Sequence, residues 1–477
     1  MIQSKQLVTS PLRVASVAVT VIFLGGCTTF SADGGFGSVG TAVKERGLTQ
    51  DVKWVKTDKD AEVVQAAVKK LLASPLTADS AAQIALLNNR GLQATYAELG
   101  IAESDLVQAG RLTNPGFTFE RLRRGDDLSI DRTFLFNVLE LIIMPIRTDL
   151  EKRRFALTQG RITAETLQVA ADTRRAYFST VAASETVKYL EQVKMAAEAS
   201  AELARRMAAV GNFSKLDQAR EQVFYAEATA QLARVRSMAL TERERLTRLM
   251  GLWGEDIGFK LPERLPDLPK TTREIGNLEA QALKQRLDVQ GAMQEAENIA
   301  SSMGLVKTTG FINVLEVGYR RNSESGLPRQ TGYVIDLRLP IFDWGSARVA
   351  RAEYTYMQAV NRAADTAIKA RSEVREAYAA YRATYDLARH YRDEIVPLRK
   401  RIAEENLLRY NGMLISVFEL LADARQQITS VNAYIEALRD YWLAESNLNL
   451  ALTGKSPGAM ALSGAGAPSM SGNAAEH

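Results

Sequence analysis

The spacing of apolar residues favours helices over two long stretches of the chain. Residues 148–249 and 346–452 contain a single proline, Pro397, and are rich in Ala, Leu, Arg, Glu and Gln, which have high helix propensity. About 60 uninterrupted helical residues would measure about 90 Å, so we expect these helices to project as rods beyond any compact domain. Their many alanines favour close coiled-coil packing, although a solvent-exposed alanine face would have the same sequence.

Strict alternation of apolar and polar residues, the pattern of a β-strand, replaces helical spacing over residues 333–341. One face carries Tyr333, Ile335, Leu337 and Leu339, and the other carries Asp336 and Arg338. The polar residues 321–328 are rich in turn formers, and the segment before them, 311–320, is the expected partner strand. This half of the chain therefore contains a predicted β-hairpin.

A second hairpin is expected in the first half, where residues 117–121 lead through the charged turn 123–127 into a strand over 131–144. Strands of about ten residues suit a tilted transmembrane β-barrel. Four aromatic residues would form an interfacial girdle or be ordinary strand residues: Phe134, Phe136, Tyr319 and Tyr333.

An internal duplication is indicated by short segments that recur at nearly constant spacing. The corresponding pairs are Pro145-Ile146 with Pro340-Ile341 (195 residues apart), and residues 211–217 with 413–419 and 249–251 with 451–453 (both 202 residues apart). Each proline pair is expected to end a strand before a long helix. The repeated unit is a hairpin followed by two antiparallel helices, and the four strands of its two copies are too few to close a barrel within one chain.

The N-terminus has the features of a lipoprotein signal peptide. Lys5 and Arg13 precede a short apolar run, and Leu24-Gly25-Gly26-Cys27 resembles a bacterial lipobox, so residues 1–26 are the predicted signal peptide. Cys27 is the predicted lipidated N-terminus; an incidental cysteine is the alternative. Residues 27–76, flexible in composition over 31–41, are expected to be an extended tether, and the Gly-, Ala- and Ser-rich residues 455–477 a disordered tail.

Composition argues against several classes of function. Sixty Lys and Arg residues nearly balance 56 Asp and Glu residues, so a nucleic-acid-binding protein is not expected. Two histidines and one cysteine leave little from which to build zinc sites or catalytic triads, so no enzyme, metal site or cofactor is predicted. The 12 methionines are scattered, as they are when methionine fills gaps in helical packing.

Several motifs together resemble the TolC-type outer-membrane efflux factor family, in particular its lipoprotein branch. The first motif extends from residues 85–90 to Asn114-Pro115, and the second consists of residues 249–252 followed by the segment from Leu261-Pro262 to Leu268-Pro269. The third is residues 339–345, and the fourth extends from Arg409-Tyr410 to Ala424-Arg425. The resemblance implies a mainly α chain with two tandem repeats, 77–252 and 273–454, joined by a proline-spaced linker, 253–272. It also implies a homotrimer with one 12-stranded transmembrane barrel and an α-helical periplasmic tunnel.

The function that this resemblance implies is a passive exit duct in the outer membrane of a Gram-negative bacterium, lipid-anchored and inserted as a barrel. Its partners would be a periplasmic adaptor (membrane fusion) protein, an inner-membrane pump and outer-membrane lipid. The alternative is a periplasmic coiled-coil adaptor or structural lipoprotein bridging the envelope. Two hairpin-plus-helix units in tandem favour the duct.

Two acidic residues, Asp217 and Glu419, fall just after the two helix-to-helix turns, at the family's periplasmic entrance. Rings of carboxylates there would favour cations. Ser214 and Ser416 precede them by three residues, which also fits helix N-caps. The two interpretations are compatible, because a trimer axis would gather capping acids into a ring.

Arg409 and Tyr410 match the region where contacts between neighbouring helix pairs close the entrance, and either is a candidate to bond Asp217; an exposed pair on a helix is the alternative. Two departures from the family pattern lie close by. Met413 replaces the usual glycine, which makes the turn geometry an open question, and Ala422 replaces the usual acid.

Overall fold

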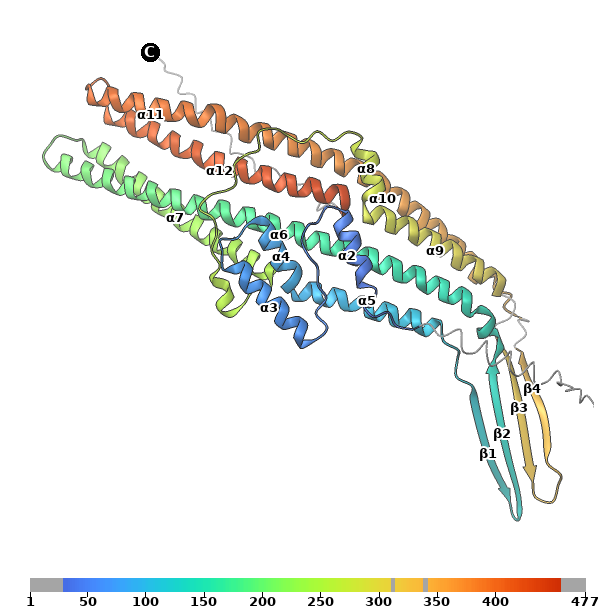
Figure 1. The fold of residues 1–477 in the computed structure, drawn as a ribbon. Coiled ribbons are helices and arrows are strands. Elements are labelled where there is room, and N and C mark those ends of the chain that lie inside the picture. Colours follow the sequence, from blue (N-terminus) through green and yellow to red (C-terminus); the bar gives the residue numbers. More distant parts are fainter. Residues whose placement is uncertain (1–28, 310–313, 338–341, 456–477) are drawn as a thin grey trace, which may run out of the picture. The chain divides into compact units, whose positions relative to one another are not determined.

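The computed structural model describes residues 29–309, 314–337 and 342–455 (Figure 1). The predictions for the signal peptide, for Cys27, for residues 339–341 and for the tail from 456 onward concern positions outside these described residues. In chain order the elements are α2 (Phe36–Glu45), α3 (Asp58–Leu72), α4 (Ala78–Asn88), α5 (Arg90–Ala109), β1 (Gly116–Arg124), β2 (Asp127–Asn137), α6 (Val138–Ala209), α7 (Lys215–Met250), the 3-10 helix η1 (Gly254–Gly258), α8 (Leu278–Gln285), α9 (Leu287–Thr309), β3 (Leu315–Glu324), β4 (Gln330–Leu337), α10 (Ser346–His390), the π-helical turn η2 (Tyr391–Ile395), α11 (Val396–Asn411) and α12 (Val417–Thr453).

The two long stretches are helical, as predicted. Helix α6 alone has 72 residues, and α7 and α12 have 36 and 37. The π-helical turn η2 lies just before Pro397, where the proline ring and its missing N–H disfavour a regular α-helical turn. No helix within the described part of the chain is both long and apolar enough to cross a membrane.

The order of elements in the first half recurs in the second, as a duplication requires. Helices α4 and α5, strands β1 and β2, and helices α6 and α7 correspond to α8 and α9, β3 and β4, and α10 to α12. The compact units are different from these repeats. Unit 1 consists of the described residues up to Val39, Thr95–Ile162 and Gln290–Thr366, and unit 2 consists of Gly40–Ala94, Thr163–Val289 and the described residues from Ala367 onward. Each unit therefore draws on both halves of the sequence.

Unit 1 contains one antiparallel sheet with strand order β1-β2-β3-β4. The hairpins are where the sequence predicts them, with shorter turns. Strand β3 continues to Glu324 instead of turning at Arg321, and β1 continues to Arg124. The register places Phe134 opposite both Phe117 and Tyr319. Strands β1 and β4 are the two edges.

The expected strand over residues 131–144 is wrong in its second part, because β2 ends at Asn137 and α6 begins at Val138. The side chain of Asn137 accepts a hydrogen bond from the backbone N–H of Glu140 (3.0 Å), so it caps the new helix. Pro145 consequently lies inside α6 and does not end a strand.

The expected extended tether over residues 27–76 is also corrected, because helices α2 and α3 form within it. Asp33 accepts hydrogen bonds from the backbone N–H groups of Gly35 (3.0 Å) and Gly37 (2.7 Å), and these bonds lower its carboxyl pKa. The hydroxyl of Ser31 donates to Glu103 of α5 (2.5 Å). Side-chain bonds thus order a segment whose composition favours flexibility.

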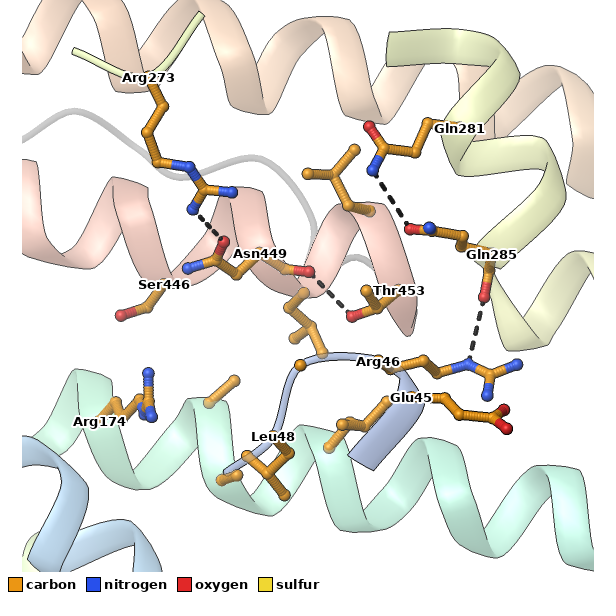
Figure 2. Close-up of a pocket in the computed structure, with 16 residues that line it drawn as sticks. Glu45, Arg46, Leu48, Arg174, Arg273, Gln281, Gln285, Ser446, Asn449 and Thr453 are labelled. Atoms are coloured by element: carbon orange, nitrogen blue, oxygen red, sulfur yellow. Dashed lines mark hydrogen bonds between the residues drawn. The ribbon is translucent and has the colours of Figure 1, made fainter. Parts of the chain in front are cut away.

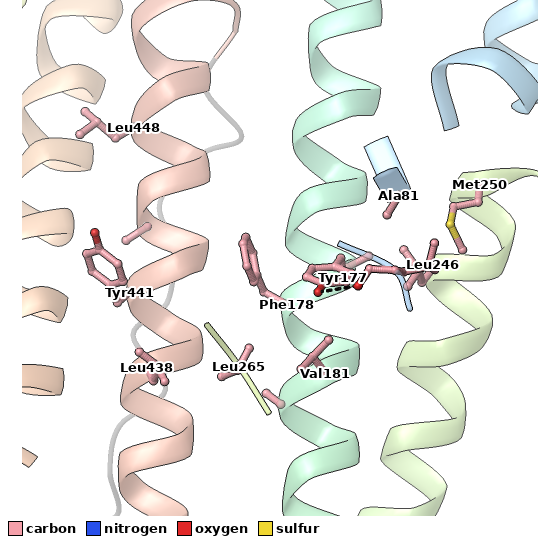
Figure 3. Close-up of a cluster of buried hydrophobic side chains, with 14 of the residues drawn as sticks. Ala81, Tyr177, Phe178, Val181, Leu246, Met250, Leu265, Leu438, Tyr441 and Leu448 are labelled. Carbon is pink, nitrogen blue, oxygen red and sulfur yellow. Dashed lines mark hydrogen bonds between the residues drawn. The ribbon is translucent and has the colours of Figure 1, made fainter. Parts of the chain in front are cut away.

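The core of unit 2 fills the space between its long helices (Figure 3). Phe178 of α6 stacks on Trp442 of α12, with ring centroids 5.2 Å apart. Tyr177 is buried and donates its hydroxyl hydrogen to the carbonyl of Leu76 (3.0 Å), and burial raises its pKa to about 12. Burying a large apolar side chain of this kind contributes roughly 1.5–3 kcal/mol, so this cluster is a major source of stability.

Residues 259–273, which we call the strap, connect the two repeats and bond to helices of both. Glu185 of α6 accepts from the N–H of Leu265 (2.9 Å), Trp442 of α12 donates to the carbonyl of Pro266 (3.1 Å), and Tyr385 of α10 donates to Lys270 (2.9 Å). Figure 3 shows Leu265 between α6 and α12. The proline-spaced linker therefore connects helices of the two repeats by hydrogen bonds within unit 2.

In each repeat, the junction between the first two helices, which we call the elbow, is hydrogen-bonded to the end of the last helix. In the first repeat Asn89, the C-cap of α4, donates to the carbonyl of Leu249 (2.8 Å) at the end of α7. In the second repeat Arg286, the C-cap of α8, donates to the carbonyl of Ala451 (3.5 Å) at the end of α12. The bonded carbonyls are separated by the same 202 residues as the repeat in the sequence.

Candidate functional site at the helix tips and in the sheet

The two helix-to-helix turns have the same backbone geometry, which answers the question raised by Met413. Two matched hydrogen bonds close each turn: Gly211 N to Ala208 O (3.1 Å) and Asn212 N to Met207 O (2.9 Å), and Met413 N to Tyr410 O (2.9 Å) and Leu414 N to Arg409 O (2.9 Å). Gly211 has a φ of 79° and Met413 a φ of 60°, so methionine adopts the left-handed conformation that glycine favours.

Both predicted serines lie at helix N-termini and contact the expected acid. The hydroxyl of Ser214 accepts from the backbone N–H of Asp217 (3.1 Å) at the start of α7, and Ser416 accepts likewise from Glu419 (3.3 Å) at the start of α12. The Asp217 carboxylate also accepts from the Ser214 hydroxyl (2.5 Å) and from Arg220 (3.2 Å). The Asp217 carboxylate therefore has a local structural role, whereas the bond of Glu419 to Ser416 is made by its backbone N–H.

Arg409 and Tyr410 lie in the last turn of α11, and Tyr410 is 38% exposed. In the described part of this single chain, neither side chain is bonded to Asp217, whose side-chain partners are Ser214 and Arg220. The structure thus brings the four predicted gate residues to the two tips without joining them. A bond between neighbouring copies stays a prediction.

The sequence did not identify the buried carboxylate of Glu221, one turn beyond Asp217. Glu221 is only 2% exposed, and it accepts from the hydroxyl of Ser200 on α6 (2.9 Å) and from Arg425 on α12 (3.3 Å). The Arg425 guanidinium also lies over the ring of Phe224, 4.2 Å from its centroid. This cluster links the α6–α7 pair to α12 near the tips. Its only signal in the sequence is the spacing of Glu221 four residues after Asp217, on the same helix face.

The sheet has two chemically different faces, which follow from its register, because directly opposed residues point to the same side. The apolar face comprises Phe117, Phe119, Arg121 and Arg123 of β1, Leu128, Ile130, Arg132, Phe134 and Phe136 of β2, Leu315, Val317, Tyr319, Arg321 and Ser323 of β3, and Thr331, Tyr333, Ile335 and Leu337 of β4. The acidic face carries the carboxylates of Glu120, Asp127, Asp131, Glu316, Glu324 and Asp336, and only the arginines Arg124 and Arg320. Arg320 forms an ion pair with Asp131.

A cavity of about 450 Å³ in unit 2 is lined by three arginines and several amides (Figure 2). Arg174 is paired with Asp79 (2.6 Å), Arg273 donates to Asn449 (3.0 Å) and Arg46 donates to the carbonyl of Gln285 (3.4 Å). These bonds join the end of α2 to α8, α6 to α4, and the strap to α12. Among the described residues, no cluster of three or more His, Cys, Asp or Glu side chains is arranged to hold a metal ion.

No family model matches the chain. One curated relative, the cobalt-zinc-cadmium resistance protein CzcC of Cupriavidus metallidurans, is 25% identical over 288 residues, which cover 57% of this chain and 64% of that protein. The chain therefore matches slightly less than two thirds of the length of this relative.

Solved outer-membrane proteins have a similar fold. The CmeC channel of Campylobacter jejuni has a TM-score of 0.62 and 18% identity, covering 85% of this chain and 90% of CmeC. The open MtrE channel of Neisseria gonorrhoeae has a TM-score of 0.65 and 16% identity (81% and 89% covered), and VceC of Vibrio cholerae has 0.65 and 14% (82% and 96%). At these identities the comparison establishes a shared fold.

Proposed function

We propose that this chain forms the outer-membrane exit channel of a tripartite efflux system in a Gram-negative bacterium. The observation that carries the proposal is the sheet, which has an apolar face, an opposite acidic face and two free edges, in a chain with the fold of solved outer-membrane channels. An apolar face suits lipid and a polar face suits an aqueous pore. No catalytic step is part of this function.

A homotrimer follows from the free edges of β1 and β4. Three copies supply 12 strands, which close a barrel with no exposed edge when β1 of one copy pairs with β4 of the next. The helices then continue the pore on the periplasmic side, where an adaptor protein docks and couples the channel to an inner-membrane pump. Lipidation of Cys27 adds an anchor in the outer membrane.

The helix tips form the gate in this proposal. Asp217 and Glu419 from three copies form carboxylate rings, and Arg409 or Tyr410 of a neighbouring helix pair bonds Asp217 in the closed state. The bonds of Glu221 to Ser200 and Arg425 keep the two helix pairs of one copy together near the tips. Opening then requires the contacts between copies to break first.

Cations are the cargo that the charges favour. The acidic face of the sheet has six carboxylates and two arginines, and the tips add further carboxylates, so a pore lined by these surfaces attracts cations. The name of the curated relative, a cobalt-zinc-cadmium resistance protein, supports divalent metal cations as the first cargo to test.

Single-channel conductance of the purified trimer in planar bilayers tests the channel and its gate. We expect small, cation-preferring steps from the wild type and larger steps when Tyr410→Phe is combined with Asp217→Ala, because this pair removes both ends of the latch. Tyr354→Phe with Asp386→Ala, which alters exposed residues of α10, is the matched control. Unchanged conductance in the first double variant would show that the latch is wrong, and a protein unable to insert into lipid would refute the channel.

A further inference from the structure

Four arginines lie on the apolar face of the sheet, all on the side of the hairpin turns. Across the strands, Phe117, Phe134, Tyr319 and Tyr333 form one row, which we call the aromatic row. Arg132 and Arg321 follow two positions beyond it, and Arg121 and Arg123 lie further toward the turn of the first hairpin. A strand rises about 3.3 Å per residue, so the arginines begin about 7 Å beyond the aromatic row.

These arginines have no acidic partners in the sheet. The apolar face has no Asp or Glu in β1 to β4, whereas Arg320 on the acidic face is paired with Asp131. Arg132 lies over the ring of Phe119 at 5.8 Å, and Arg123 donates to the carbonyl of Gly125 (2.9 Å). Arg121 and Arg321 are exposed. The apolar face therefore presents cations whose charge no carboxylate of the described strands neutralises.

The position of these cations identifies the kind of partner. An arginine facing the middle of a bilayer is energetically unfavourable, and the cost falls toward the interface, where aromatic girdles also lie. Every basic residue in the four strands is an arginine, and its planar guanidinium binds phosphate oxygens in a bidentate manner that lysine does not reproduce. Phosphate groups just outside the hydrocarbon layer match this arrangement.

We propose that Arg121, Arg123, Arg132 and Arg321 bind the phosphate groups of lipopolysaccharide in the outer leaflet. This inference rests on the proposed function, because the channel orientation directs the hairpin turns to the outside, where lipopolysaccharide is the anionic lipid. Acyl chains lie against the aromatic row and against the apolar residues on the side of that row away from the hairpin turns, while the phosphates contact the guanidinium groups. Three copies would repeat this surface around the barrel.

Binding of lipid A to the purified trimer tests the proposal. Native mass spectrometry or a fluorescence titration would compare bisphosphorylated lipid A, the same lipid with its phosphates removed, and phosphatidylglycerol. The variant replaces all four arginines by glutamine. The matched control, Arg124→Gln with Arg320→Gln, removes the arginines of the opposite face. Since each arginine near an anionic lipid surface is worth about 1 kcal/mol, affinity for bisphosphorylated lipid A should fall about 100-fold or more in the variant and little in the control.

Several outcomes would overturn the assignment: unchanged binding by the variant, equal binding of lipid A without phosphates, or equal affinity for phosphatidylglycerol. Two double variants, Arg121→Gln with Arg123→Gln and Arg132→Gln with Arg321→Gln, each expected to weaken binding partially, keep the test decisive if the fourfold variant does not fold. Conductance in phosphatidylcholine bilayers tests the channel separately. A wild type that conducts there while the variant loses only lipid A binding supports both proposals, and a conducting wild type without lipid A binding refutes this one alone.

Discussion

At the scale of single residues, Met413 has a backbone conformation that glycine adopts more easily. Its φ is 60°, and its side chain is 93% exposed, so packing contributes little to hold it there. The left-handed conformation costs an L-residue roughly 1–2 kcal/mol, against roughly 0.5–1 kcal/mol of extra chain entropy for glycine in the unfolded state. Met413→Gly should therefore stabilise the α11–α12 turn by about 0.5 kcal/mol, seen as slower hydrogen exchange of residues 409–416.

Gly412 provides the control for this prediction, because its φ is −83° and a Cβ there would make only ordinary contacts. Gly412→Ala should change exchange little. Gly211→Ala, at the corresponding position of the first tip with a φ of 79°, should accelerate exchange of that turn. Faster exchange in Met413→Gly would mean that contacts of the methionine, absent from the single chain, hold the turn.

Glu445 gives the stability of unit 2 a dependence on pH. Burial raises the pKa of its carboxyl above the ordinary value, and nearby Arg273 and Arg174 lower it by less. The folded state therefore binds the proton more tightly than the unfolded state, so stability is greatest below the unfolded pKa of 4.5 and falls as pH rises through the raised folded value. Glu445→Gln should melt at a higher temperature than the wild type at pH 7.5, and the difference should vanish near pH 4.5.

The control for this pH dependence is Glu404→Gln, at a side chain that is 66% exposed. It should leave the melting temperature close to that of the wild type at both pH values. If Glu445→Gln melted below the wild type at pH 7.5, attraction to Arg273 and Arg174 would outweigh burial, contrary to the raised pKa.

At the scale of elements, Arg286 holds the elbow between α8 and α9 to two other helices. It is 1% exposed, and it pairs with Asp288 (2.6 Å) and with Glu373 of α10 (2.8 Å). Burial opposes its charge, but the bonds and charges of these two carboxylates outweigh burial and raise its pKa. Removing one partner of a buried ion pair costs about 3–5 kcal/mol, so Arg286→Met should lower the stability of unit 2 by about that amount in thermal unfolding.

Neutralising the two carboxylates that lose their arginine partner should recover most of this lost stability. Arg286→Met combined with Asp288→Asn and Glu373→Gln leaves no uncompensated buried charge, so it should unfold at a higher temperature than Arg286→Met alone. Arg286→Lys should recover only part of the stability, because a lysine cannot donate in parallel to both carboxylates. Equal stability of all three variants would show that the elbow depends on packing alone.

The sequence predicted those helices, strands and turns that depend on neighbouring residues in the chain. Alternation identified the hairpin around Tyr333, and the spacing of Ser214 to Asp217 identified the tip. The apolar run 138–144 was misassigned to a strand, although Asn137 and Glu140 carried a capping signal. The bond of Glu221 to Arg425 joins residues 204 positions apart, and only the folded helix pairs bring them together.

At the scale of the whole molecule, the nearly balanced composition conceals a separation of charge. The chain has a formal net charge of +4, which by itself indicates no charged surface. In the sheet, however, four arginines lie on the apolar face without any acid, and six carboxylates lie on the other face with two arginines. This arrangement fits the proposed channel wall, with anionic lipid on one side and a cation-conducting pore on the other, and only the register of the strands reveals it.

Closure of three sheets into one barrel makes a prediction that depends on these faces. If β1 of one copy pairs with β4 of the next, opposed residues must lie on the same face, with Cα atoms about 4.5–5.5 Å apart, which is within the range of a disulfide. Leu122 of β1 lies on the acidic face, as do Gly332, Val334 and Asp336 of β4, whereas Tyr333 and Ile335 lie on the apolar face.

Leu122→Cys combined in turn with cysteine at each of these five β4 positions should give oxidised dimers and trimers on non-reducing gels. Cross-links should form only with the acidic-face set and be strongest at one or two neighbouring members of it, because the register between copies is fixed. Cross-links of equal yield to both faces would mean that the edges meet without strand pairing, and the absence of any cross-link in a protein of trimer mass would contradict pairing of Leu122 with β4 anywhere over residues 332–336.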